Sequence, residues 1–76
     1  MSKSTTDLRS IATAGGGMIL DSTKYSTTDL RSIATAANGK GARITLRNAN
    51  SKSTTDLRSI ATAGGGVVVF DFDFLS

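Results

Sequence analysis

The sequence predicts an α/β fold, in which three helix–strand units form a short parallel sheet and stack their helices on one face, in the manner of a solenoid. The first observation is a segment of eleven residues, STTDLRSIATA, that is present three times. Its copies occupy residues 4–14, 26–36 and 53–63. A stretch of strand-forming residues follows each copy, and strands joined through helices normally run parallel with right-handed crossovers. The copies begin 22 and 27 residues apart, which lies within the range of solenoid units.

The chain has 76 residues, which leaves room for one small domain. We therefore expect a single repeat domain over residues 1–76. Its units are expected at about residues 2–24, 25–50 and 51–76.

The copies are identical at every position, and the first and third extend to identical blocks of 16 residues, 2–17 and 51–66. Packing constrains only the inward-facing positions, so copies that drift apart should differ at the exposed ones. Identity throughout indicates consensus engineering or a very recent duplication, and we favour an engineered, idealised repeat.

Each copy is expected to form a helix. Ser4 is a suitable N-cap, because its hydroxyl can accept a hydrogen bond from a backbone N–H of the first turn. Asp7 places a negative charge near the positive end of the helix dipole. Leu8, Ile11 and Ala12 follow at the spacing of an apolar helical stripe, which we expect to be buried. The equivalent capping residues of the later copies are Ser26 with Asp29, and Ser53 with Asp56.

Glycine follows each copy closely. Gly15, Gly39 and Gly64 are therefore expected to adopt the left-handed conformation that ends a helix. Tyr25 precedes the cap of the second copy, and Leu30 lies at the fourth helical position, so this pair can form a hydrophobic staple. Short helices rich in Ser and Thr are marginal in water alone, so each helix needs a packing partner.

The intervening segments are expected to be strands. In the second, Ile44 and Leu46 alternate with polar residues, and in the third, phenylalanine alternates with valine and aspartate. Such alternation is typical of strands with one covered and one solvent-facing side. In the first strand, either Met18 and Leu20 or Ile19 can face inward. The expected strands are residues 18–20, 42–47 and 67–74.

Opposite charges on the solvent-facing side favour pairing of the second and third strands, by a few tenths of a kcal/mol per contact. The second strand offers Arg43 and Arg47, and the third offers Asp71 and Asp73.

The pattern Ile44-x-Leu46-x-x-Ala49-Asn50, followed by a polar turn and a capped helix, resembles the strand-and-turn segment of leucine-rich repeats of the α/β type. Unit lengths of 22 and 27 residues fit that family. The resemblance covers one unit well, whereas residues 18–22 lack the full leucine framework. It implies a parallel-sheet solenoid with a scaffold or protein-binding role, and it supplies no functional residue.

The composition argues against an enzyme. The chain has no His and no Cys, and its six acidic residues are all aspartate. This excludes imidazole bases, thiol nucleophiles and the common structural zinc sites. We therefore expect no catalytic, cofactor-binding or metal-binding residues.

The charge and hydropathy are typical of a soluble, cytoplasmic-type protein. The net charge is +3, a mild excess that more often reflects solubility than binding to nucleic acid. Apolar runs are far shorter than a membrane span, and the residues after Met1 are polar, unlike a signal peptide. We expect no membrane contact and do not favour nucleic acid as a partner.

Three motifs have a functional and a structural interpretation. Glycine triplets at residues 15–17 and 64–66 follow helices, whereas phosphate-binding loops precede them, so we interpret the triplets as connectors. The loop at residues 38–43 is either an anion-binding nest or, as we favour, a solvated loop. Its possible anion contacts are Lys40, Arg43 and, further along the strand, Arg47. The aspartates Asp21, Asp71 and Asp73 are interpreted as charged residues that oppose aggregation, rather than as an acid–base pair or a cation site.

Residues 67–75 combine high strand propensity with an absence of proline. If this strand lies at a sheet edge, its free backbone groups can pair with another chain, and if it lies in the middle, they cannot. The candidate self-association residues are Val67, Val69, Phe70, Phe72 and Phe74. The function we expect is a non-enzymatic scaffold that forms homo-oligomers through its sheet edges. The alternative is a binding module whose basic strand and loop contact an anionic or protein partner.

Overall fold

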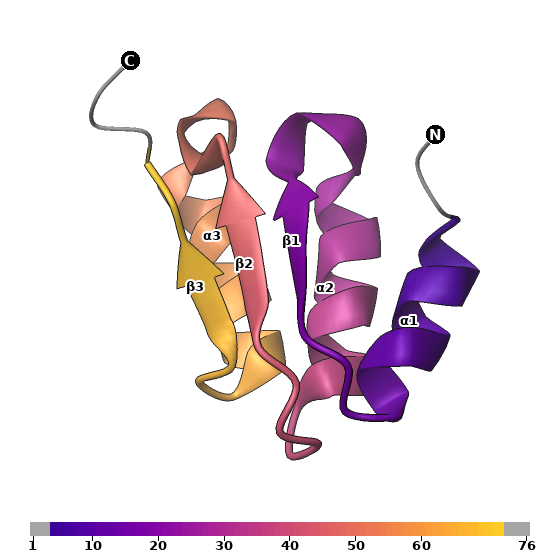
Figure 1. Ribbon diagram of the computed structural model, residues 1–76. Helices are drawn as coiled ribbons and strands as arrows, with labels where there is room; N and C mark the ends of the chain where they lie inside the picture. The colour runs from indigo at the N-terminus through magenta and orange to yellow at the C-terminus, as the bar shows by residue number, and fades with distance from the viewer. Residues whose placement is uncertain (1–3, 73–76) are drawn as a thin grey trace.

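The computed structural model describes residues 4–72, which contain three helices, three strands and two short 3-10 helices (Figure 1). In chain order these are α1 (Thr5–Thr13), β1 (Met18–Asp21), η1 (Ser22–Lys24), α2 (Thr27–Ala37), β2 (Ile44–Arg47), η2 (Ala49–Ser51), α3 (Thr54–Gly64) and β3 (Val68–Phe70). All three helices lie on one face of the sheet, and the other face is open (Figure 1). The predicted α/β class and helix arrangement are therefore confirmed.

The three predicted N-caps are confirmed. The hydroxyl of Ser4 accepts a hydrogen bond from the backbone N–H of Asp7, at 3.2 Å. The equivalent bonds at Ser26 and Ser53 are both 3.1 Å long. Each bond satisfies one of the four N–H groups that a helix start leaves without a partner in the helix.

The helix ends agree with the sequence in two cases and differ in the third. Gly15 and Gly39 follow α1 and α2 with φ angles of +91° and +76°. Gly64 was expected in the same role, but it is the last residue of α3, and Gly65 takes the left-handed conformation, with a φ angle of +59°. The helix continues through Gly64 because the N–H of Gly65 still donates to the carbonyl of Ala61.

The strands form one parallel sheet in the order β1-β2-β3. Along β2, Leu46 is aligned with Leu20 on one side and with Phe70 on the other. The open question in the first strand is resolved, because Leu20 is 8% exposed and Ile19 is 71% exposed. The second and third strands are shorter than expected, and the predicted part of the third strand beyond residue 72 lies outside the described residues.

The core lies between the sheet and the helix layer. Its largest buried apolar side chains are Leu30, Ile33, Ile44, Leu46 and Ile60. Tyr25 is partly buried against this core, and its staple contact with Leu30 stays a prediction.

The apolar helical stripe is buried in α2 but only in part in α1. Ile33 and Ile60 are fully buried, whereas the equivalent Ile11 is 39% exposed. The prediction that Ile11 is buried was wrong. Its helix lies at one end of the layer, so it has a neighbouring helix on one side only (Figure 1).

Candidate association surfaces

The first candidate surface is the free edge of β3. The N–H of Ile44 donates to the carbonyl of Val67, and the N–H of Asp71 donates to the carbonyl of Leu46. Backbone groups alternate in direction along a strand, so the N–H and C=O groups of Val68 point away from β2. The third strand thus lies at a sheet edge and not in the middle (Figure 1).

The predicted self-association residues have different positions around this edge. Val69 is 39% exposed on the open face of the sheet, while Val67 and Phe70 are partly buried against the core. The rings of Phe70 and Phe72 lie 6.2 Å apart, centroid to centroid. Phe74 and Asp73 lie outside the described residues. The free edge is therefore offered by the backbone, and the described phenylalanines are not an exposed apolar row.

Two further candidate surfaces lie at the two ends of the helix layer. α1 leaves Ile11 exposed at one end, and α3 leaves Leu57 and Ala61 half-buried at the other. Their equivalents in α2 are fully buried, because α2 lies between two helices. Sequence reasoning missed these surfaces, because the residues that form them have the same identity and position in the repeated segment as residues that form the core in α2.

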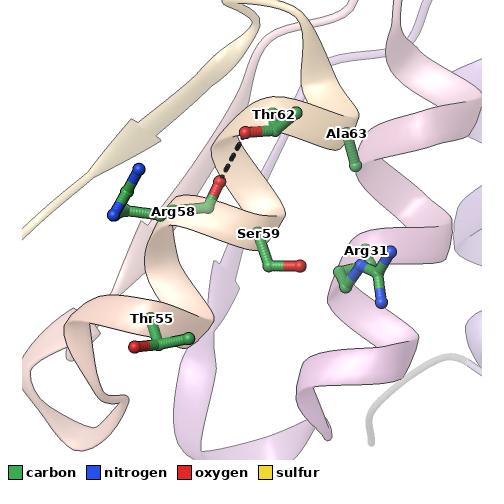
Figure 2. A pocket seen from close by; sticks show the side chains of 6 residues that line it. All are labelled: Arg31, Thr55, Arg58, Ser59, Thr62 and Ala63. Atoms are coloured by element: carbon green, nitrogen blue, oxygen red, sulfur yellow. Dashed lines mark hydrogen bonds between the residues drawn. The ribbon is translucent and has the colours of Figure 1, made fainter.

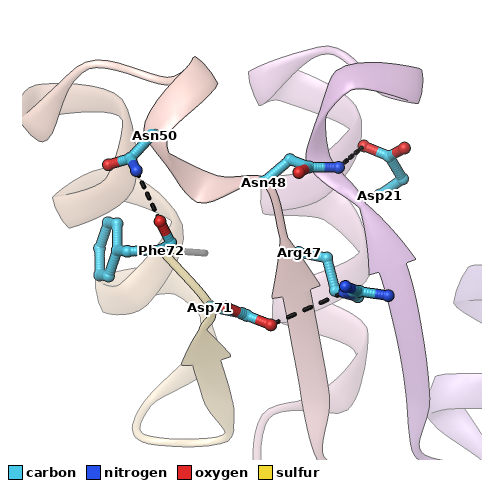
Figure 3. Close-up of polar contacts among 6 residues, drawn as sticks. All are labelled: Asp21, Arg47, Asn48, Asn50, Asp71 and Phe72. Carbon is cyan, nitrogen blue, oxygen red and sulfur yellow. Dashed lines mark hydrogen bonds and ion pairs between the residues drawn. The ribbon is translucent and has the colours of Figure 1, made fainter. Parts of the chain in front are cut away.

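The open face of the sheet carries a row of side chains aligned across the strands. Ile19, Thr45 and Val69 are in register, and Ile19 and Val69 are exposed. Beside this row, Arg47 Nε lies 3.6 Å from a carboxylate oxygen of Asp71 (Figure 3). The expected attraction between opposite charges of the second and third strands is confirmed for this pair. Both side chains are solvent-exposed, so the contribution to stability is small.

Polar side chains join the strand ends to one another (Figure 3). Asp21 accepts hydrogen bonds from the N–H and the hydroxyl of Thr23, at 2.9 and 2.7 Å, and from the Asn48 amide at 3.1 Å. The bonds from Thr23, followed by the bond from Asn48, lower the pKa of Asp21 from 3.8 to about 2. On the next strand pair, the Asn50 amide donates to the carbonyl of Phe72 at 2.6 Å. The bonds donated by Asn48 and Asn50 join neighbouring units, whereas the bonds from Thr23 are local to the first unit.

The three predicted anion contacts are not alike in their surroundings. Lys40 is exposed in the loop between α2 and β2, and Arg43 is exposed just before β2. Arg47 is the last residue of β2 and is paired with Asp71. Four residues of extended chain place Arg47 roughly 13 Å from Arg43, so the three side chains do not form one compact cluster.

A groove of about 400 Å³ runs between α2 and α3 on the outer surface of the helix layer (Figure 2). It is lined by Arg31, Thr55, Arg58, Ser59, Thr62 and Ala63. Figure 2 shows Arg58 pointing away from Arg31, so the two guanidinium groups do not converge on one ligand. The Thr62 hydroxyl is already used, because it donates to the carbonyl of Arg58 at 2.9 Å. The groove thus offers one cationic group beside two hydroxyls, which is a weak basis for a specific site.

Within residues 4–72, no group of three or more metal-ligating side chains comes together. None of the helices in this range is long and apolar enough to cross a membrane. Comparison with protein-family models, curated proteins and solved structures found no match to this chain. No family is identified for this chain, and the expected membership of a leucine-rich-repeat-like class stays a prediction; what the structure shows is three helix–strand units with one parallel sheet.

Proposed function

We propose that this protein is a non-enzymatic structural scaffold that associates with copies of itself through its sheet edges. The observation that carries the proposal is that, within residues 4–72, β1 and β3 each pair with one strand only, so both edges of the parallel sheet are without a strand partner in this range. Free edges are templates for pairing with another chain, and proteins that avoid association usually block them with proline, charge or a covering segment. This chain has no proline, and the charge of Asp71, directly after β3, is paired with Arg47 of the same sheet. We regard its identical copies as idealised repeat units, of engineered origin.

The small size of the core also supports association. A chain of 76 residues buries only about 60% of the surface that it exposes when unfolded, so its stability as a monomer is marginal. Pairing with another copy covers additional apolar surface and adds backbone hydrogen bonds.

The test is the mass in solution by light scattering over a concentration series, with circular dichroism to confirm the fold. We expect a mass above 7.8 kDa that rises with concentration. Val68→Pro removes an N–H that points to the free edge and should weaken association at least tenfold. Val68→Ala, the matched control, truncates the side chain, keeps the N–H and should associate nearly as well. A folded wild-type protein that stays at 7.8 kDa throughout would overturn the proposal.

A second candidate function is the binding of an anionic partner. Lys40 lies between two left-handed glycines, Gly39 and Gly41, and both Lys40 and Arg43 lack a carboxylate partner in the described range. Titration with duplex DNA at low and high salt tests this candidate, because contacts to phosphate weaken steeply with salt. Lys40→Ala should weaken such binding more than Arg47→Ala, since Arg47 is already paired with Asp71. Absence of binding at low salt would exclude it.

A further inference from the structure

The two sides of each helix are unlike, and this gives the helix layer a direction. In α2, Leu30 and Ala34 lie on one side of the helical stripe and Ile33 on the other, and all three are buried. A Cβ atom added to Gly64 of α3 would lie 3.4 Å from the Cβ of Ala34. The side with leucine and alanine therefore faces the following helix, and the side with isoleucine faces the preceding one. We call these the Leu/Ala side and the Ile side.

The terminal helices confirm this direction through what they leave exposed. In α1, Leu8 and Ala12 are buried against α2, while Ile11 is 39% exposed. In α3 the pattern is reversed, since Ile60 is fully buried and the Leu/Ala side is only half-buried. One end of the molecule thus presents an Ile side, and the other presents a Leu/Ala side.

These two open sides are complementary, because the same residues already pack together inside the molecule. The segment that contains them is identical in all three copies. Contact of the Leu/Ala side of α3 with the Ile side of α1 from another copy would repeat the α1–α2 contact with the same side chains. Contact between two like sides would have no counterpart inside the molecule.

We infer that this protein binds a second copy of itself head to tail, with α3 of one copy packed on α1 of the next and β3 beside β1 in a continued parallel sheet. This inference rests on the proposed self-association and adds its polarity. The molecule measures 32 × 28 × 21 Å. An end face is therefore on the order of 600 Å², and two such faces would bury about 1,200 Å², the lower bound for specific interfaces. A heterologous contact of this kind forms an open chain of copies, unless a rotation closes it into a ring.

Two variants block one end each. Ile11→Glu places a charge on the Ile side of α1, and Ala61→Glu places one on the Leu/Ala side of α3, where only a methyl group is replaced. Thr13→Glu on α1, at a position about 200° around the helix from Ile11, and Thr55→Glu on α3 carry the same charge change away from these sides and serve as matched controls. Circular dichroism and thermal unfolding verify that every variant is folded. Leu57→Glu provides a second block at the α3 end, so one unfolded variant does not end the test.

Light scattering of each variant alone and of their mixture then measures the polarity. Each blocked variant should remain at 7.8 kDa, and an equimolar mixture should form a 1:1 dimer of twice that mass, because each supplies the open end that the other lacks. The controls should associate like the wild type. If Ile11→Glu alone still dimerises, or the mixture stays monomeric while the wild type associates, the head-to-tail inference is wrong and the proposed scaffold stands. If the folded wild type itself never associates, the proposed function fails as well.

Discussion

Residues 4–17 and 53–66 have the same sequence, yet they differ in helix length and in burial. The first forms α1, of nine residues, and the second forms α3, of eleven. Ile11 is 39% exposed in α1, while its equivalent Ile60 is fully buried. Both helices begin at the same serine cap. Local sequence therefore decides where these helices begin, whereas tertiary contacts decide where they end and which side chains they bury.

The strand that follows each block explains the different helix ends. Met18 and Val67 each come directly after the block. In the sheet, however, Ile44 of β2 is aligned with Met18 of β1 and with Val68 of β3, so β3 is aligned one residue further from its block than β1 is. If Val67 instead of Val68 were aligned with Ile44, Phe70 would face solvent and Asp71 would face the core. A slip of one residue reverses both faces, because side chains alternate along a strand.

The longer α3 absorbs the extra residue of this slip, since a helical residue advances the chain by only about 1.5 Å. The glycine triplet makes both arrangements accessible. Gly15 adopts a positive φ after α1, and Gly65 and Gly66 do so after α3. Residues with a side chain rarely adopt such angles, so one of the two arrangements would be strained without glycine.

The largest expected effect separates the two isoleucines. Ile60→Ala should destabilise the protein by about 3 kcal/mol, because it leaves a cavity at a fully buried position. Ile11→Ala should cost less than about 1 kcal/mol, measured below the concentration of association, since Ile11 is partly in solvent already. Urea denaturation measures both. Equal losses would contradict the difference in burial between the two helices.

The next effect tests the one-residue slip. Deletion of Val67 gives the third block the same spacing to its strand as the first, so the sheet register should survive. The expected loss is about 1 kcal/mol, from the side chain that packs against the core. Val67→Gly removes the same side chain at constant length and should cost a similar amount. If the cooperative unfolding transition is lost in the Val67 deletion but kept in Val67→Gly, the one-residue difference in register does not determine where α3 ends.

A comparison of the two strand-end turns predicts a stabilising change. Ser22 and Ala49 are the first residues of η1 and η2, and both are fully buried. Among the described residues, the Ser22 hydroxyl finds no hydrogen-bond partner. Burial of a polar group without a partner costs free energy, so Ser22→Ala should stabilise the protein by about 1 kcal/mol. The melting temperature measures this, and a decrease would show that the hydroxyl does have a partner in solution.

The smallest expected effect is on the stability of the protein at acid pH. The folded protein lowers the pKa of Asp21 to about 2, so the stabilisation from its hydrogen bonds is complete above about pH 4 and is lost as the pH falls towards 2. Asp21→Asn should reduce stability at neutral pH, and the difference from the wild type should shrink between pH 4 and pH 2. Denaturant midpoints over this range measure it. A difference that stays constant with pH would contradict the lowered pKa.

Much of the fold could be predicted from the sequence, but less of the candidate surfaces. The caps at Ser4, Ser26 and Ser53 follow from hydrogen bonds within four residues, and the inward side of β2 follows from its alternation. The edge position of β3 could not be predicted, because strand order depends on contacts between distant segments. The end sides of the helix layer escaped prediction for a related reason, since nothing in an identical segment marks which copy lies at the end.

The sequence by itself therefore determined the start of every helix, the parallel direction of the strands and the inward side of β2, because these depend on short-range bonds and on the alternation of side chains. Only the tertiary structure decided that Ile11 is exposed while Ile60 is buried, that Gly65 rather than Gly64 takes the left-handed conformation at the end of α3, and that β3 is displaced by one residue relative to its sequence block. Each of these depends on what lies beside a segment. Identical segments acquire different properties when one has neighbours on both sides and another on one side only.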